Sequence, residues 1–245
     1  RAVHEPVAFS MKPFSPTPHR VYLPDGKLPL RARFANASLP EAAKQCERVY
    51  LPYTTVPEKL AALQEEGFRV ALDLPRGLFG MEQALKQRLA EARDAGVTHV
   101  WAGNLGAAAL AKELGMTVHG GFSLNVTNSA AIEWYAAFGL ADTELSFELA
   151  LSAAAALGGE LPRGLVLYGR LPLMLTRNCP AANSAKGCLH CTAAPELTDR
   201  KGVHFPVQCY GACSEVLNSV PLWMADRLAE VKQMDFGVLR FTTET

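Results

Sequence analysis

Short runs rich in β-branched residues alternate along most of this chain with longer segments rich in alanine and leucine. The run at Arg48–Pro52 (RVYLP) predicts a strand, and residues 57–66 predict a helix, because proline begins that segment and Gly67 follows it. In residues 81–95 the apolar positions recur at intervals of three and four, which again predicts a helix. This alternation of strand and helix indicates parallel βαβ units.

The same pattern assigns an element to most of the chain after residue 32. Strands are predicted at 48–52, 68–74, 97–102, 116–119, 142–145, 164–168, 203–207, 215–218 and 238–242. Helices are predicted at 57–66, 81–95, 106–114, 128–138, 148–157 and 222–233. Strands that recur about every 20–25 residues favour the α/β class and a TIM-like (β/α) barrel, incomplete or irregular, with a cysteine-rich loop inserted after a late strand. An open doubly wound sheet is the alternative, because it shows the same alternation.

The first part of the chain is rich in proline. Residues 1–31 contain Pro6, Pro13, Pro16, Pro18, Pro24 and Pro29. Proline interrupts both helices and strand ladders, so we expect an extended arm or linker at 1–31 and one barrel module at 32–245. The N-terminus has no apolar run of the kind found in signal peptides, and we expect it to be a cut inside a longer chain.

Composition and charge narrow the classes of function. The chain has 245 residues, 49% hydrophobic and 20% charged, which is enough for one large α/β domain with an ample core. Lys+Arg and Asp+Glu each count 24, so no overall charge favours nucleic acid or a membrane surface. Without an export signal or an apolar window of about 18 residues, we expect a cytoplasmic protein, in which clustered cysteines indicate metal or redox chemistry.

Five of the six cysteines lie between residues 167 and 226, at Cys179, Cys188, Cys191, Cys209 and Cys213. Cys188 and Cys191 form a Cys-x-x-Cys pair that can present two thiolates to one metal, so a second arm must supply the other ligands. Together with Cys209 and Cys213 this pair is near a zinc-ribbon spacing, whereas with Cys179 and Cys209 it suits a [4Fe–4S] cluster. The spacing alone does not choose between the two, because both accept four thiolates.

Polar residues also follow several of the predicted strands, where a barrel enzyme holds its catalytic groups. They are Asp73, Arg76, Asn104, Asn125, Asn128, Glu144, Ser146 and Arg170. Each by itself suits a helix cap or a turn, and only their shared placement indicates a site.

Seven motifs resemble a known family. They are GFSLNVTNS (121–129), ELS (144–146), YGRLPLM (168–174), RNCP (177–180), LTDRKG (197–202), FPV (205–207) and EVLNSVP (215–221). Over about residues 40–245 the sequence resembles the peptidase U32 family, the collagenase-like proteins of bacteria, and is most similar to the second, C-terminal U32-type module of the long members. The resemblance implies a TIM-like barrel and a [4Fe–4S] cluster held by four cysteines. Such members hydroxylate or otherwise modify RNA bases or quinone precursors, whereas "peptidase" is the older family label.

The resemblance also assigns the ligands of the metal centre. They are Cys179, Cys188, Cys191 and Cys209, with Cys213 in reserve. Their spacing departs from the pattern of the family's first module, which keeps Zn²⁺ as the alternative metal. We expect the metal loop to span about 171–221 and its centre to face the barrel mouth. The implied partner is the first U32 module of the same full-length chain, and the implied substrate is RNA.

Three hypotheses of function result. The first is an iron–sulfur enzyme, or part of one, that hydroxylates RNA bases or a related substrate. Its substrate-facing candidates are Glu144, Asn125, Arg170 and Asp199. The second is the peptidase of the family label, although the sequence has no HExxH, no GxSxG and no convincing Ser/His/Asp set. The third is a non-catalytic module with a structural zinc site.

Overall fold

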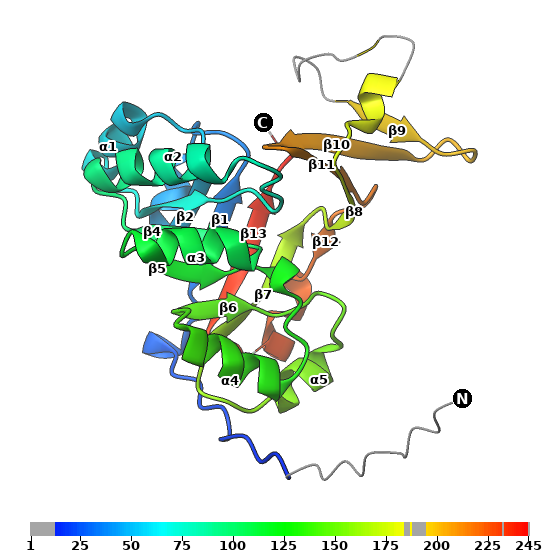
Figure 1. Ribbon diagram of the computed structural model, residues 1–245. Coiled ribbons are helices and arrows are strands. Elements are labelled where there is room, and N and C mark those ends of the chain that lie inside the picture. Colours follow the sequence, from blue (N-terminus) through cyan, green and yellow to red (C-terminus); the bar gives the residue numbers. More distant parts are fainter. Residues whose placement is uncertain (1–12, 184–186, 188–194, 232, 245) are drawn as a thin grey trace, which may run out of the picture.

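Eight parallel strands form a closed barrel in the computed structural model, which describes residues 13–183, 187, 195–231 and 233–244 (Figure 1). The strands are β1 (Leu30–Phe34), β2 (Arg48–Pro52), β3 (Val70–Asp73), β4 (His99–Ala102), β5 (Thr117–Gly120), β6 (Asp142–Glu144), β7 (Arg163–Gly169) and β13 (Phe236–Phe241). They pair in chain order from β1 to β7, and β13 closes the ring between β7 and β1. The predicted TIM-like barrel is thus confirmed, and the open sheet is excluded.

The first barrel strand lies partly in the segment that we expected to be a linker. β1 has the sequence LRARF and begins at Leu30, so the arm ends earlier than residue 31. Arg31 and Arg33 are only 5% and 7% exposed, because both side chains point into the barrel and bind carboxylates there. A run with two arginines does not look like a buried strand, which is why the hydrophobic pattern missed it.

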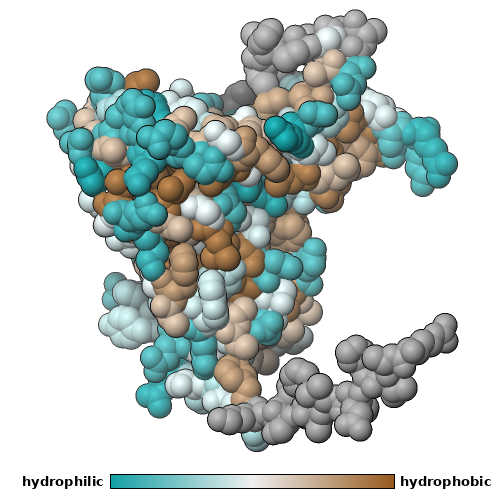
Figure 2. Space-filling view, in the orientation of Figure 1, coloured by the Kyte–Doolittle hydropathy of each residue, from teal (hydrophilic) through white to brown (hydrophobic). Residues whose placement is uncertain are grey.

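In the described residues, five α-helices pack around the outside of the barrel (Figure 1). They are α1 (Pro57–Glu65), α2 (Glu82–Asp94), α3 (Leu105–Glu113), α4 (Ser129–Phe138) and α5 (Leu151–Ala156). Their apolar faces and the outward faces of the strands share one buried core, and Figure 2 shows polar side chains over the outer surface of α1 and α2. The side chains of Asn104 and Asn128 cap α3 and α4, each accepting a backbone N–H at 2.8 Å, so both have structural roles.

In the described residues, a 3₁₀ helix takes the place of an α-helix before β2 and before β13. η2 (Glu41–Gln45) joins β1 to β2, and η5 (Ala225–Val231) precedes β13. The helix predicted at 222–233 is therefore wrong. Its first residues form β12 (Leu222–Trp223), which pairs antiparallel with β7, and this tertiary pairing outweighs the helical propensity of the segment.

A small antiparallel sheet is inserted between β7 and β13, as predicted for the cysteine-rich loop. In spatial order it contains β8 (Pro172–Thr176), β11 (Cys213–Leu217), β10 (His204–Tyr210) and β9 (Glu196–Thr198). The sheet lies beyond the carboxyl end of β13, over the mouth of the barrel (Figure 1). We call this insertion the roof.

Charged side chains fill much of the barrel interior near the amino ends of its strands. Arg31 donates to both carboxylate oxygens of Asp142, at 2.8 and 2.9 Å, and its guanidinium lies 3.7 Å from the ring centroid of Phe236. His119 Nδ1 contacts Asp142 Oδ2 at 2.7 Å, and His99 Nδ1 contacts His119 Nε2 at 2.9 Å. This network replaces the aliphatic layers that fill many barrels.

Replacing Asp142 is expected to unfold the barrel more readily. Burial by itself raises the pKa of Asp142, but the hydrogen bonds and charges of His119 and Arg31 outweigh it and lower the pKa to about 2. Asp142→Ala leaves Arg31 buried without its main partner. The free energy of unfolding, measured with urea, should therefore fall by about 3–5 kcal/mol. Asp94→Ala, in an exposed pair with Arg93, should cost about 1 kcal/mol or less. Equal losses in the two variants would contradict the network's role.

The His99 ring is expected to make stability depend on pH. Burial, followed by the effects of Arg48 and His119, lowers the pKa of His99 to about 4. An unfolded histidine has a pKa of about 6.5, so between these values the unfolded chain binds more protons and stability falls as pH falls. In His99→Gln the urea midpoint should change less with pH, between about pH 6.5 and 4, than it does in the wild-type protein. The exposed control His204→Gln should keep the wild-type pH dependence. An unchanged slope in His99→Gln would refute this.

Candidate functional site

Four charged side chains project into the barrel near the carboxyl ends of their strands. Arg33 comes from β1, Asp73 from β3, Glu144 from β6 and Arg240 from β13, and all four are less than a tenth exposed. The register between β1 and β13 aligns Arg33 with Arg240. This end of a (β/α) barrel is where active sites are built, so these residues define the barrel mouth as a candidate site.

The Arg33–Asp73 ion pair is the centre of the mouth. Arg33 donates from Nε and Nη2 to Asp73 Oδ2, at 3.2 and 2.6 Å, and its guanidinium lies 3.8 Å from the ring centroid of Trp101. Burial raises the pKa of Asp73, although the charge of Arg33 opposes the rise. The pair thus links β1 to β3 inside the barrel, and one face of the Arg33 guanidinium packs against the Trp101 ring.

Glu144 lies beside this pair and is the one predicted catalytic residue that faces the barrel interior. Its Oε1 accepts a hydrogen bond from Trp101 Nε1 at 2.6 Å, and its Oε2 accepts one from the Phe122 backbone N–H at 3.1 Å. Burial raises the pKa of Glu144, and Arg33 and the two donors oppose that rise. The Glu144 side chain is therefore held in one orientation in a buried environment.

The roof covers the mouth through the β10–β11 hairpin. Glu215 Oε1 accepts a hydrogen bond from Arg76 Nη1 at 2.8 Å, and its other oxygen lies 3.6 Å from Arg240. Burial raises the pKa of Glu215, but the charges of Arg240 and Arg76 outweigh it and lower the pKa. The Tyr210 hydroxyl donates to the Asp73 carbonyl and accepts the Tyr53 backbone N–H at 3.3 Å. The insert is thus tied to the barrel by buried polar contacts.

A cavity of about 20 Å³ remains under the roof. Within the described chain, four residues that line this cavity each have one fully buried polar atom with no hydrogen-bond partner: Arg33 Nη1, Asp73 Oδ1, Arg240 Nε and Thr242 Oγ1. Leaving a buried donor or acceptor unsatisfied costs about 1–3 kcal/mol per group. The mouth therefore holds hydrogen-bonding capacity that the protein itself does not use.

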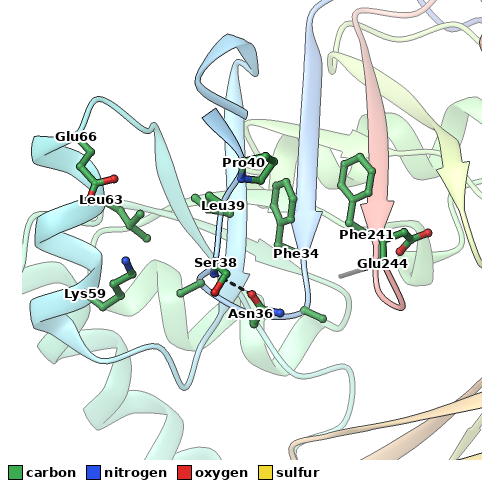
Figure 3. A pocket seen from close by; sticks show the side chains of 12 residues that line it. Phe34, Asn36, Ser38, Leu39, Pro40, Lys59, Leu63, Glu66, Phe241 and Glu244 are labelled. Carbon is green, nitrogen blue, oxygen red and sulfur yellow. Dashed lines mark hydrogen bonds between the residues drawn. The ribbon is translucent and has the colours of Figure 1, made fainter. Parts of the chain in front are cut away.

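A much larger hollow of about 930 Å³ lies outside the barrel, between the β1–η2 loop, α1 and the end of β13 (Figure 3). Phe34, Leu39, Leu63 and Phe241 give it apolar walls, and Lys59 is at its edge. The Ser38 backbone N–H donates to Asn36 Oδ1 at 2.8 Å, and Figure 3 marks this hydrogen bond with a dashed line. Its charged groups do not converge, so the smaller mouth is the stronger candidate for chemistry.

Two of the predicted metal ligands lie together on the roof. Cys179 Sγ and Cys209 Sγ are 3.5 Å apart although 30 residues separate them, and Cys209 Sγ is also 3.4 Å from Ser214 Oγ. Cys188 and Cys191 fall outside the described residues. No group of three or more His, Cys, Asp or Glu side chains within the described segments is arranged to hold a metal. Among the described residues, this thiol pair therefore supplies at most two ligands of a metal centre.

The thiol pair lies on the face of the roof that points away from the mouth. Side chains alternate between faces along a strand, and Tyr210, next to Cys209, reaches the barrel at Asp73. Cys209 therefore points outward, as its contact with Ser214 on β11 indicates. The expectation that the centre faces the mouth is corrected for these two ligands, because register decides the face and spacing does not.

Cys213 lies on the opposite face from Cys209. It pairs with Tyr210 across the hairpin, is buried, and lies so close to Gly77 that a Cβ there would be 2.5 Å from its sulfur. Burial raises the pKa of its thiol. One ion cannot bind Cys209 and Cys213 while the hairpin stays paired, so the geometry favours the ligand set that contains Cys179.

The other predicted site residues are not brought together with Glu144. Asn125 is exposed, at a φ of 54° after the 3₁₀ turn Phe122–Leu124. Arg170 donates to the Asn218 carbonyl at the base of the roof, at 3.0 Å, and to Thr243 Oγ1 after β13, at 3.3 Å.

Asp199 lies in the β9–β10 turn, away from the mouth. Its Oδ1 accepts the backbone N–H groups of Lys201 and Val203 at 2.7 and 3.0 Å, so it stabilises the turn itself. This turn is exposed and forms a hydrophilic tip in Figure 2.

Several mouth residues were not identified from the sequence. Arg33, Arg240, Tyr210 and Glu215 were missed, whereas Asp73 and Arg76 were noted only as residues at a strand end. One signal in the sequence could have indicated the arginines. In LRARF they occupy alternate positions of an apolar run, and a charge that points into the barrel needs a buried partner.

The chain matches no protein-family model and no curated protein sequence. Among the described residues, no helix has the length and apolar character that crossing a membrane requires. The fold and the site together define a TIM-like barrel whose charged mouth is covered by an inserted antiparallel sheet.

Arg76→Ala is expected to loosen the roof. The Arg76–Glu215 pair is largely buried, and removing the arginine leaves Glu215 without its closer partner. The free energy of unfolding should therefore fall by about 3–5 kcal/mol. Amide hydrogen exchange in β10 and β11 should then become faster than exchange in the barrel strands. The control Arg93→Ala removes an exposed pair and should leave the pattern unchanged. Unaltered protection of the hairpin in Arg76→Ala would contradict this function of the pair.

Proposed function

We propose that this chain is a U32-type barrel module in which Cys179, Cys188, Cys191 and Cys209 hold a [4Fe–4S] cluster on the outer face of the roof. The observation that supports it best is the contact between Cys179 and Cys209, two thiols brought to 3.5 Å from distant parts of the sequence. Thiolates are the ligands that iron–sulfur clusters and zinc prefer. The donor set therefore fits a cluster, although its two described sulfurs must spread to bind separate irons.

In this proposal the module belongs to a cytoplasmic enzyme that hydroxylates RNA bases or a related substrate. A bound cluster would supply redox or substrate-activating chemistry. Cys179 and Cys209 are partly exposed on the face opposite the mouth, where an electron donor can approach. The first U32 module of the same full-length chain is the proposed partner, and the family resemblance supports this part of the proposal.

A structural zinc site is the second candidate, favoured by the same distance. Two sulfurs bound to one zinc at about 2.3 Å in a tetrahedron stand about 3.8 Å apart, which is close to the 3.5 Å between Cys179 and Cys209. A closed site of four thiolates is structural, and the module would then be non-catalytic.

The peptidase hypothesis has little support from the described residues. No described serine hydroxyl is hydrogen-bonded to a histidine, as a serine nucleophile requires. His99 bonds to His119, and His119 bonds to Asp142, near the amino ends of the strands, on the far side of the barrel from the roof. Proteolysis thus stays a hypothesis drawn from the family label.

Anaerobic purification with metal analysis and an absorption spectrum tests the centre. We expect bound iron and a broad band near about 400 nm, lost in Cys179→Ser and in Cys209→Ser. Cys213→Ser, on the other face, and Cys46→Ser, in the main core, are matched controls that should keep the band. Colourless protein with one zinc would replace the cluster by zinc, and loss of the band in Cys213→Ser alone would overturn the ligand set.

The reaction is tested in the full-length protein. Hydroxylated nucleosides in RNA treated with the wild-type enzyme should be absent after treatment with the Cys179→Ser/Cys209→Ser variant. Hydroxylation that persists without the cluster would refute the proposed role of this module. Cys46→Ser again controls for general effects of losing a buried thiol.

A further inference from the structure

One part of the barrel's outer surface is poorly covered by helices. A (β/α) barrel usually has an α-helix after each strand, and in the described residues 3₁₀ helices take these places before β2 and before β13. Strands β2 to β5 are almost entirely buried, whereas Leu30, Tyr168, Leu239 and Phe241 on β1, β7 and β13 are at least partly exposed. We call the outward face of β1, β13, β7 and β12 the uncovered wall.

Four aromatic rings form a continuous row across the uncovered wall. In order from β1 to β12 they are Phe34, Phe241, Tyr168 and Trp223, and the ring centroids of successive neighbours are 5.0, 5.3 and 5.6 Å apart. Figure 3 shows the first two side by side on β1 and β13. These are the distances of packed aromatic pairs. The row ends at Trp223, which is 62% exposed and so is left largely uncovered by its own chain.

A hollow of about 420 Å³ lies on the uncovered wall beside Trp223. Within the described segments its lining has no charged side chain, and the Tyr168 hydroxyl already donates to Glu244 Oε1 at 2.8 Å. The hollow therefore offers apolar contact almost alone. Its lining residues are Leu30, Leu167, Tyr168, Trp223, Ala225, Leu228, Leu239 and Phe241.

The chemistry of this hollow limits what can occupy it. Nucleic acids and anionic membranes are bound through lysine and arginine, and a charged ligand loses its hydration here without gaining a partner. An added peptide strand needs an open strand edge, whereas the backbone groups of β1, β13 and β7 already pair within the barrel. The uncovered wall thus suits the apolar surface of another folded protein.

We propose that this occupant is the uncovered wall of a second copy of the chain, in a dimer with two-fold symmetry. A two-fold interface brings one surface against itself, so an exposed side chain must lie next to a hollow that can receive it. Trp223 and the hollow beside it meet this requirement, and Leu228, 48% exposed in the same lining, packs next to them. Two uncharged surfaces also meet without burying an unpaired charge.

The uncovered wall has a limited extent, which sets the expected strength of the dimer. Beyond Phe241 the larger hollow outside the barrel begins, and Lys59 and Glu66 lie in its lining. The apolar contact therefore ends near Phe241. Small interfaces are typical of weak complexes, so we expect a dissociation constant of about 1–100 µM.

This interface is separate from the mouth and from the proposed metal centre. Its side chains point outward from the barrel strands, whereas the mouth residues point inward, and the thiols of Cys179 and Cys209 lie on the roof. The Cys179→Ser/Cys209→Ser variant should therefore form the dimer as the wild-type protein does. Failure of the dimer would leave the proposed metal centre untouched, and the reverse also holds.

Sedimentation equilibrium of the purified protein tests the proposal. Between about 1 and 200 µM, the average mass should rise from that of the monomer, 26.5 kDa, toward twice this value. Trp223→Glu and Leu228→Glu should each raise the dissociation constant by about 10-fold or more, because each buries an unpaired carboxylate in the interface. The matched control is Trp134→Glu on α4, where Trp134 is 52% exposed, and it should keep the wild-type dissociation constant.

Leu228→Glu keeps the test valid if Trp223→Glu does not fold. Trp223 contacts the Tyr168 ring within its own chain, so its loss also affects the monomer. Leu228 is exposed on η5, and Leu228→Glu should keep the urea midpoint of the wild-type monomer.

Tryptophan fluorescence locates the interface. The chain has three tryptophans, and Trp101 is fully buried in the monomer. In Trp134→Phe, Trp223 is therefore the one tryptophan that can pass from water into an apolar contact. We expect its emission maximum to shift to shorter wavelength as the protein concentration rises. The double variant Trp134→Phe/Leu228→Glu should show no such shift.

Three results would overturn the proposal. One is a mass that stays at that of the monomer up to about 200 µM. Another is a dimer that Trp134→Glu dissociates and Leu228→Glu does not, which would place the interface on α4. The third is a mass that rises in Trp134→Phe while the emission maximum stays constant, which would show that another surface forms the dimer.

Discussion

The buried ion pair between Arg33 and Asp73 is the contact on which the mouth of this barrel depends. It joins β1 to β3, and its guanidinium stacks on Trp101, whose indole in turn holds Glu144. The roof reaches the same place, because the Tyr210 hydroxyl bonds the Asp73 carbonyl. Removing either charge would leave the other buried and unpaired, which proteins tolerate poorly. Barrel, site and insert thus share one electrostatic constraint.

The two faces of the inserted sheet hold different chemical groups, because side chains alternate between the faces along each strand. Its inner face contributes Tyr210 and Glu215 to a buried, charged space, and its outer face holds the thiols of Cys179 and Cys209. A strand has two faces, so one short hairpin can serve both without either set of groups disturbing the other. Residues adjacent in the chain, such as Cys209 and Tyr210, therefore belong to different sites.

Local patterns predicted the elements whose neighbours in space are also neighbours in the chain. The helices α1 to α4 and the strands β2 to β7 follow from apolar periodicity and from proline, asparagine or glycine at their ends. β1 was missed because its arginines pair inside the barrel, and the helix at 222–233 was wrong because Leu222 and Trp223 pair with β7. Glu144 was placed in the mouth correctly, but Asp199 was not, because a turn that is capped locally looks the same as a site residue.

The sequence by itself determined the βαβ repeat and the cluster of cysteines after a late strand, since both are properties of residues close together in the chain. Only the tertiary structure decided that β13 closes the ring against β1, a pairing between opposite ends of the chain. It also decided which charges meet in the mouth and on which face Cys209 and Cys213 lie. Closure, pairing and face depend on strand register, and register is set by contacts between distant segments that no local pattern contains.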